Sequence, residues 1–209
     1  SFVMLNPEHI LLSVSLIILV LVPGLALFEA QSTGLIAAYG FNDVLAPLKD
    51  SSGNNLTAQC GAGSTCPSYS STLGYLGSDA YNFTGAGNSL TLPDEARFDF
   101  TQHLTVSFWI KMERFVNPWE AFVNKGDTSW SVERYSTTSR VSFATQNTAR
   151  QHQETAPSTL VDNNQWHFIA VTYNGQRKAV YIDGVLRATK SYNALLATNN
   201  LPVRIGFNS

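Results

Sequence analysis

The chain contains few charged residues. Asp, Glu, Lys and Arg together make up 13% of it, and the formal net charge is −2. It has no basic run and no basic stripe, the features with which nucleic-acid-binding proteins neutralise phosphates. We therefore expect no nucleic-acid partner. The low charge, together with abundant Ser, Thr, Asn and Gly, is common among extracellular β proteins.

Cysteine is also scarce. The two cysteines, Cys60 and Cys66, are too few for a tetrahedral zinc site, and no pair of histidines lies near them in the sequence. The loop between them contains glycine and is long enough to close a disulfide, a bond that forms in oxidising compartments. Two independent buried thiols are the alternative. We predict the disulfide.

Catalytic motifs are absent from the sequence. There is no nucleophile elbow, no phosphate-binding loop and no His-Glu-x-x-His motif. Glycoside hydrolysis needs two carboxylates that flank the scissile bond, and no Glu-x-Asp-x-Glu run supplies them. The acids in the relevant region are scattered: Glu95, Asp99, Glu113, Glu120, Asp127 and Glu133. His103 and His152 are predicted in loops, and His167 is predicted to be packed or hydrogen-bonded at an edge. We expect no catalysis.

One long apolar segment runs from Ile10 to Phe28. As an α-helix it would be about 28 Å long, close to the hydrocarbon thickness of a bilayer. Asn6 is a suitable N-cap and Pro7 suits the first helical position, while Pro23 is expected to kink the helix. The sequence therefore predicts a long N-terminal hydrophobic α-helix within residues 1–31, surrounded by lipid or by copies of itself.

The flanks of this segment suggest how it is used. The first Lys or Arg is Lys49, and the chain opens on Ser1 and Phe2, as it would if a short basic leader had been removed. The segment resembles the N-terminal helix of type IV pilin-like proteins, although Leu5 and Asn6 stand where pilins usually carry a glutamate. The resemblance implies a filament in which copies pack through residues 7–29. A simple membrane anchor, or a sequence that begins inside a protein, is the alternative.

From Gly34 onward the hydrophobic period is two, which indicates strands. In Leu104–Lys111, for example, Val106, Phe108 and Ile110 alternate with other side chains, whereas Trp166–Tyr173 is apolar on both faces, as in a central strand. Asp183-Gly184 predicts a tight hairpin turn between Lys178–Ile182 and Val185–Thr189. The other predicted strands are Ile36–Phe41, Leu56–Cys60, Ala80–Phe83, Ser89–Leu92, Ala121–Asn124, Ser131–Arg134, Val141–Thr145 and Val203–Gly206. The polar stretch from Asn147 to Ser158 predicts a surface loop. The sequence thus predicts one antiparallel sandwich over residues 34–209.

The ordered set of short motifs resembles one family. The motifs are Tyr39-Gly-Phe41, Asp50-Ser-Ser-Gly-Asn54, Ala80-Tyr-Asn-Phe83, Leu90-Thr-Leu-Pro93, Thr105–Lys111, Trp166–Tyr173, Val180-Tyr-Ile-Asp-Gly184 and Ile205-Gly206. Together they resemble a laminin G-like domain of the concanavalin A-like jelly-roll group. The resemblance implies an all-β fold of two stacked antiparallel sheets, preceded here by the predicted helix.

The resemblance also raises a question about the end of the domain. Such domains usually continue past the strand that contains Ile205-Gly206 into a final strand that pairs near the first one. We therefore expect an open slot beside Ile36–Phe41, unless the sequence is cropped. An unpaired apolar edge is an aggregation liability, and a neighbouring subunit can fill it by adding a strand.

Two further kinds of site are predicted in loops and turns. Asp50 and Asn54 flank a turn that supplies oxygen ligands, and similar domains often bind Ca²⁺ at a rim loop, so a calcium ion is one reading and an Asx turn at Asp50 is the other. Asn55-Leu-Thr and Asn82-Phe-Thr are acceptor triplets for glycosylation.

A sugar site requires aromatic platforms with polar groups beside them. Trp119, Trp130, Tyr135 and Tyr192 are the candidates, although each also suits the edge of a sandwich. The sequence leads us to expect a non-catalytic, extracellular subunit at the cell surface, which assembles through its helix and displays the sandwich for adhesion. A membrane-anchored module that binds glycan or protein is the alternative, and a hydrolase is the least favoured one.

Overall fold

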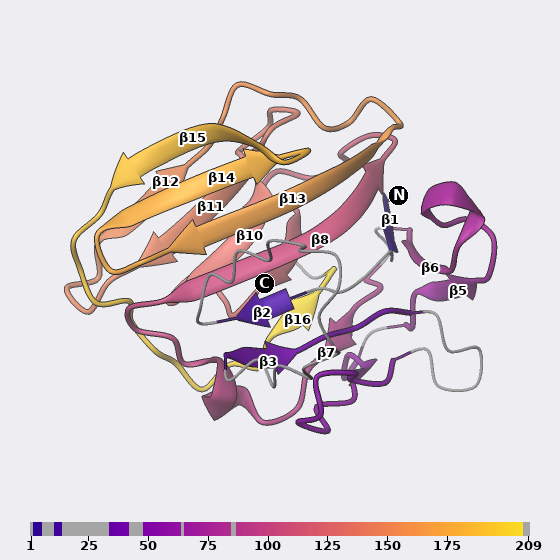
Figure 1. Cartoon of the computed structure of the whole chain (residues 1–209), viewed down its shortest axis with the longest axis horizontal. Coiled ribbons are helices and arrows are strands. Elements are labelled where there is room, and N and C mark those ends of the chain that lie inside the picture. Colours follow the sequence, from indigo (N-terminus) through magenta and orange to yellow (C-terminus); the bar gives the residue numbers. More distant parts are fainter. Residues whose placement is uncertain are drawn as a thin grey trace, which may run out of the picture.

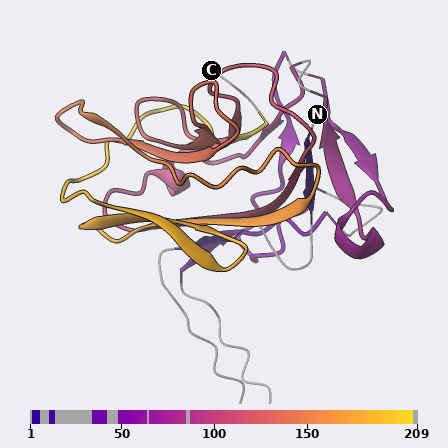
Figure 2. The same cartoon turned by 90° about the horizontal axis from the view of Figure 1, so that it is seen from above.

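The structure is a computed structural model that describes residues 2–5, 11–13, 34–41, 48–63, 65–84 and 87–206, with the backbone alone described in the first two ranges. Two antiparallel sheets form a sandwich, seen face-on in Figure 1 and edge-on in Figure 2. The helical segments of the described residues are two short 3-10 turns, η1 (Tyr75–Gly77) and η2 (Glu95–Phe98). Within the described part of the chain, no helix is long and apolar enough to cross a membrane.

The first sheet has nine strands among the described residues, and its main path ends with the hairpin strands at one edge. Its order is β15 (Val185–Ser191), β14 (Arg177–Ile182), β13 (Trp166–Tyr173), β8 (Leu104–Met112), β1 (Phe2–Leu5), β6 (Ala80–Phe83) and β5 (Ser68–Ser70). Off this path, β2 (Leu11–Ser13) pairs with both β8 and β3 (Leu35–Ala37). Backbone of the same chain thus pairs with one edge of β3, within the strand beside which a slot was expected.

The second sheet has seven strands in the described part of the chain. Its order is β12 (His152–Thr155), β11 (Val141–Gln146), β10 (Trp130–Arg134), β9 (Ala121–Asn124), β16 (Arg204–Ile205), β7 (Leu90–Thr91) and β4 (Gln59–Cys60). Strands distant in sequence, such as β7 and β16, are therefore neighbours (Figure 1).

The core lies between the sheets because alternate side chains of each strand point inward. Val106, Phe108 and Ile110 of β8 are buried there, as the sequence predicts. They face an apolar layer from the other sheet, which includes Val132 and Phe143. β13 is central, but only its alternate residues are fully buried, so the prediction that both faces are covered is wrong in part.

The tight turn predicted between the last two long strands is confirmed. Asp183 and Gly184 have φ angles of 54° and 75°, the left-handed values that a type I′ hairpin requires at both central positions. The Asp183 carboxylate also anchors this end of the sheet, because its Oδ1 accepts a hydrogen bond from the Phe168 amide at 2.9 Å.

The predicted helix is not shown. Most of the segment from Ile10 to Phe28 lies outside the described residues. Where the backbone is described, at Leu11–Ser13, it is a strand paired with β3 and β8. The prediction of helix is therefore corrected for these three residues: their amide and carbonyl groups pair between strands, which a helical turn would preclude.

Candidate functional site

The candidate site is built on the outer face of the second sheet, over β10, β11 and β12. On β10, Trp130 and Val132 enter the core, so the alternate residues Ser131 and Glu133 point to the opposite face. Strand register places Glu133 directly across from Ser142. The next pairs along the sheet bring Glu154 opposite Ala144 and His152 opposite Gln146. One face of three strands thus gathers polar side chains.

These side chains open onto a cavity of about 550 Å³, within the range of small-molecule binding sites. The cavity combines one large aromatic side chain with carboxylate, amide, hydroxyl and imidazole groups. Its lining residues are Trp119, Asp127, Thr128, Glu133, Gln146, His152 and Glu154.

Glu133 forms the most buried part of this lining, with only 6% of its surface exposed. Its Oε2 accepts a hydrogen bond from the Ser131 hydroxyl at 2.6 Å. Burial raises the pKa of Glu133 to about 7, and the nearby carboxylates of Asp127 and Glu154 act in the same direction, against the opposing effects of Ser131 and Lys178. Glu133 therefore changes charge near neutral pH.

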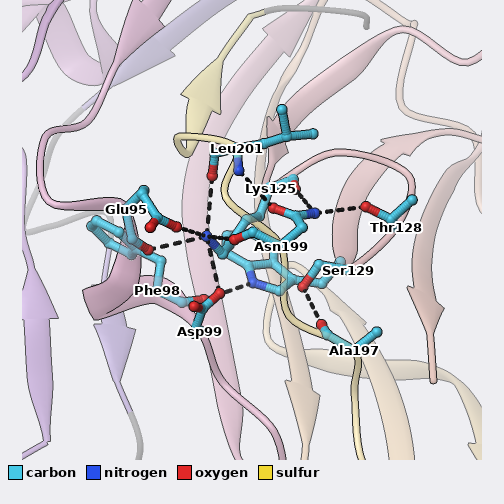
Figure 3. Close-up of polar contacts among 10 residues, drawn as sticks. Glu95, Phe98, Asp99, Lys125, Thr128, Ser129, Ala197, Asn199 and Leu201 are labelled. Carbon is cyan, nitrogen blue, oxygen red and sulfur yellow. Dashed lines mark hydrogen bonds and ion pairs between the residues drawn. The ribbon is translucent and has the colours of Figure 1, made fainter. Parts of the chain in front are cut away.

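The turn between β9 and β10 carries Asp127 and Thr128, and a buried lysine fixes it. Lys125 has no exposed side-chain surface, and its Nζ contacts Glu95 Oε2 at 2.9 Å and Asp99 Oδ1 at 3.0 Å. Nζ also donates to the carbonyl oxygens of Asn199 and Leu201, at 3.1 and 3.0 Å. Figure 3 shows this hub, in which one ammonium group joins η2 to the loop before β16. The hub anchors the base of the turn that reaches the cavity.

Asn199 connects the same hub to the cavity lining. Its Nδ2 donates to the Lys125 carbonyl oxygen and to Thr128 Oγ1, both at 2.8 Å. Nearby, the Ser129 hydroxyl donates to the Ala197 carbonyl oxygen at 2.7 Å (Figure 3). These contacts hold the turn rigidly against residues some seventy positions later in the chain, so the position of Thr128 depends on the whole sandwich.

Trp119 occupies a strained backbone position at the cavity. Its φ of 57° lies in the left-handed region, which a bulky side chain rarely adopts. The loop before it is fixed, because Glu120 Oε1 accepts hydrogen bonds from the amides of Val116 and Asn117 at 3.0 and 2.7 Å. The indole packs edge-on against Tyr135 and remains 37% exposed. The loop thus presents an aromatic surface at the cavity at some conformational cost.

A second buried lysine supports the site from behind. Lys178 of β14 has no exposed surface, and its Nζ donates to the carbonyl oxygens of Phe143 and Gln153 and to Thr145 Oγ1, at 2.8, 2.5 and 3.0 Å. Burial lowers the pKa of Lys178 to about 7. Its contacts tie β11 and β12, whose outer faces line the cavity, to the opposite sheet.

Residues 84–209 match the family model Laminin_G_3, of the concanavalin A-like lectin/glucanases superfamily. The chain belongs to this family. The resemblance seen in the motifs is therefore confirmed for a segment that contains the whole candidate site. Among curated proteins, no sequence matches this laminin G-like chain.

Solved structures share the fold at low sequence identity. The binding domain of Paraclostridial Mosquitocidal Protein 1 is 17% identical with a TM-score of 0.65, over 95% of this chain and 44% of that one. Domain 4 of AbnA, a GH43 extracellular arabinanase from Geobacillus stearothermophilus, solved in complex with arabinotriose, is 19% identical with a TM-score of 0.63 and covers 82% of both chains. The binding domain of botulinum neurotoxin serotype D is 18% identical with a TM-score of 0.56, over 76% of this chain and 40% of that one. The laminin G-like chain thus spans less than half the length of the two toxin domains.

The predicted calcium ligands of the laminin G-like domain are engaged with the protein itself. Asp50 Oδ1 accepts hydrogen bonds from the Ala38 and Ser52 amides, each at 2.9 Å. Its Oδ2 accepts from the Ser52 hydroxyl at 2.7 Å and from the Leu56 amide at 2.9 Å. Asn54 Nδ2 donates to the carbonyl oxygens of Leu35 and Ile36 in β3, each at 2.9 Å. These contacts fit the Asx-turn reading, and calcium binding there stays a prediction.

The other predicted sites of the domain have mixed outcomes. The disulfide between Cys60 and Cys66 is confirmed. Asn55 is exposed, whereas Asn82 is half-buried in β6 between two neighbouring strands. Glycosylation of both asparagines stays a prediction. His167 is bonded as expected, with Nδ1 2.8 Å from Asp183 Oδ2 and Nε2 3.0 Å from Asn163 Oδ1.

The structure brings together only part of the predicted sugar platform. Trp119 lines the cavity and Tyr135 packs against it, but Trp130 is a core residue whose Nε1 donates to the Phe98 carbonyl oxygen. Tyr192 is also buried, packed against Tyr173. Four of the six acids that looked scattered fall into two groups. Glu95 and Asp99 pair with Lys125, whereas Asp127 and Glu133 face the cavity.

The sequence analysis assigned no site role to four cavity residues, Thr128, Gln146, His152 and Glu154. The last two lie in β12, inside the stretch predicted to be a polar loop. The alternation of His152, Gln153, Glu154 and Thr155 carries no apolar signal, so the usual period-two test does not detect the strand.

Proposed function

We propose that this laminin G-like domain is a non-catalytic carbohydrate-binding module and that the cavity over β10–β12 is its glycan site. The observation that carries the proposal is the composition of the cavity. One partly exposed indole, Trp119, stands beside hydrogen-bonding groups from four separate elements. A sugar ring offers an apolar carbon face and a rim of hydroxyls, and this combination matches both.

The fold relatives support the proposal by analogy. A domain of the same fold was solved with arabinotriose, and the binding domain of botulinum neurotoxin DC was solved in complex with SialylT. Fold alone does not assign a function, and the support for a glycan ligand comes from the cavity of this chain. The disulfide of Cys60 and Cys66 supports an extracellular location, because such bonds persist in oxidising compartments.

A glycan array tests the proposal directly. The whole chain and its Trp119→Ala variant are compared with Trp166→Ala, a matched control in which a half-buried tryptophan is removed from the opposite sheet. We expect Trp119→Ala to weaken binding about tenfold or more, equivalent to about 1.4 kcal/mol, and Trp166→Ala to leave it unchanged. Undiminished binding by Trp119→Ala, or no binding to any glycan by the parent chain, would contradict the proposal.

A second function, assembly through the apolar segment at residues 7–29, is favoured by the sequence of that segment. Within it, the uncharged and mostly apolar stretch Ile10–Phe28 is long enough to need lipid or copies of itself around it. We propose that it carries the domain at the cell surface, in a filament or in a membrane. Electron microscopy of purified material distinguishes the two, because filaments form without lipid only in the first case. Monodisperse, lipid-free monomers would exclude both.

A further inference from the structure

The carboxylates of the cavity have no strong cationic partner in its lining. Asp127, Glu133 and Glu154 all face the cavity, and among its described lining residues there is no lysine or arginine. The only basic group there is His152, whose Nδ1 is 3.8 Å from Glu154 Oε1. The buried ammonium of Lys178 binds carbonyl oxygens on the other side of the sheet. The cavity therefore concentrates negative charge.

Glu133 is also incompletely hydrogen-bonded. Its Oε2 accepts from Ser131, whereas its Oε1 accepts no hydrogen bond from the described part of the chain, although the residue is only 6% exposed. Ser142, directly across from it on β11, is fully buried, and its hydroxyl likewise has no partner among the described residues. Glu133 lines the cavity, so its Oε1 is available to accept a hydrogen bond from a ligand there.

The kind of donor follows from the charge. A hydroxyl supplies one proton to a carboxylate, whereas an ammonium supplies three and also neutralises the repulsion among the carboxylates, which is visible in the effect of Asp127 and Glu154 on Glu133. Within the described residues, no three such side chains converge closely enough to hold a metal ion. The lining is instead spread around a space large enough for a sugar ring.

We propose that the cavity prefers amino sugars, with the protonated amine bound by Glu133 and Asp127 while the ring stacks on Trp119. This inference rests on the proposed carbohydrate function. It also predicts discrimination against acidic sugars, because a sulfate or carboxylate on the ligand would meet the carboxylates of Asp127 and Glu154.

Matched sugar pairs test the preference. Oligomers of glucosamine and galactosamine are compared with their N-acetylated forms by calorimetry at about pH 6.5, where the free amines are protonated. We expect the amine form to bind about tenfold tighter at low salt, and this ratio to shrink as salt screens the charges. Glu133→Gln and Asp127→Asn should each reduce the ratio to about threefold or less. Glu113→Gln, which removes one exposed charge outside the cavity lining, should keep the ratio.

The outcomes separate the two proposals. If the N-acetylated forms bind as tightly as the amines, or if both cavity variants keep the ratio, the amino-sugar preference is wrong and the carbohydrate function stands. If no sugar binds, both proposals fail. Nα-acetyllysine methylamide is the last probe. If this ammonium compound binds as tightly as the amino sugar, the cavity recognises only the positive charge. That result would overturn the assignment to sugars.

Discussion

At the scale of single residues, Asp50 shows how a carboxylate can stabilise a loop without any ligand. Burial raises the pKa of Asp50, but the hydrogen bonds from Ala38, Leu56 and Ser52 outweigh this effect, so that its pKa lies below the ordinary value. A carboxyl group with a depressed pKa stabilises the fold above its unfolded-state pKa, and this stabilisation is lost as the pH falls through the folded-state pKa.

We expect Asp50→Ala to destabilise the domain by about 2–4 kcal/mol, because it leaves the buried amides of Ala38 and Leu56 without acceptors. Urea unfolding at neutral pH measures the loss. Lys49→Ala, at the exposed neighbouring position, serves as the control and should change stability little. The loss from Asp50→Ala should shrink as the pH falls well below 4. A constant loss down to low pH would contradict this account.

At the scale of elements, the predictability of the fold depends on where each strand keeps its apolar side chains. β6, β9 and β13 have the predicted bounds, because at least one face of each strand packs on the apolar core. β12 was predicted to be loop since even its inward residues are polar: Thr155 is buried, and the Gln153 carbonyl oxygen receives Lys178. Polar residues such as these can be buried only because another strand supplies their hydrogen-bond partner. The local sequence pattern does not contain that partner.

The candidate site was partly predictable for the same reason. Trp119 is predictable from the sequence as a candidate aromatic platform. The grouping of Asp127, Glu133 and Glu154 follows from the register of β10, β11 and β12 and from a turn fixed by Lys125. Neither the register of these strands nor the contact between Lys125 and η2 can be predicted from the spacing of residues in the sequence.

The hub at Lys125 makes a prediction about the turn between β9 and β10. Lys125→Met keeps the length of the side chain but leaves the carboxylates of Glu95 and Asp99 and three carbonyl oxygens without their ammonium, at a cost of about 3–5 kcal/mol. We expect lower thermal stability and, in the protein that remains folded, weaker glycan binding through displaced Asp127 and Thr128. Arg97→Ala, which breaks an exposed pair with Asp94 on the same 3-10 turn, should change neither. Unchanged stability of Lys125→Met would contradict the role of the hub.

At the scale of the whole molecule, a buried carboxyl group and a buried ammonium group lie against opposite faces of the second sheet. Glu133 lies on the cavity face, and Lys178 lies on the core face, where it bonds to the backbone of β11 and β12. Both have pKa values shifted to about 7 by burial, from 4.5 and 10.5. The free energy of unfolding of the whole domain should therefore change with pH on both sides of neutrality, where exposed carboxyl and lysine groups do not titrate.

The sign differs for the two groups. Between pH 4.5 and 7 the folded state keeps the Glu133 proton that the unfolded chain has lost, so stability falls as the pH rises. Between pH 7 and 10.5 the unfolded chain binds a proton at Lys178 that the folded state does not, so stability rises with pH. The two contributions together predict a minimum of stability near neutral pH, with a gain of about 1–3 kcal/mol on each side.

Urea unfolding of the whole chain across about pH 5 to 9 measures this profile, a range chosen because it lies between the ordinary pKa values of carboxyl and lysine groups. We expect Glu133→Gln to remove the fall on the acidic side and Lys178→Met to remove the rise on the basic side, each leaving the other limb in place. The outer-face variant Lys111→Met is the control for the loss of a lysine charge, and it should keep both limbs. A wild-type profile that peaks at neutral pH would mean that one or both groups titrate at their ordinary values, and the buried positions assigned to them would then be wrong.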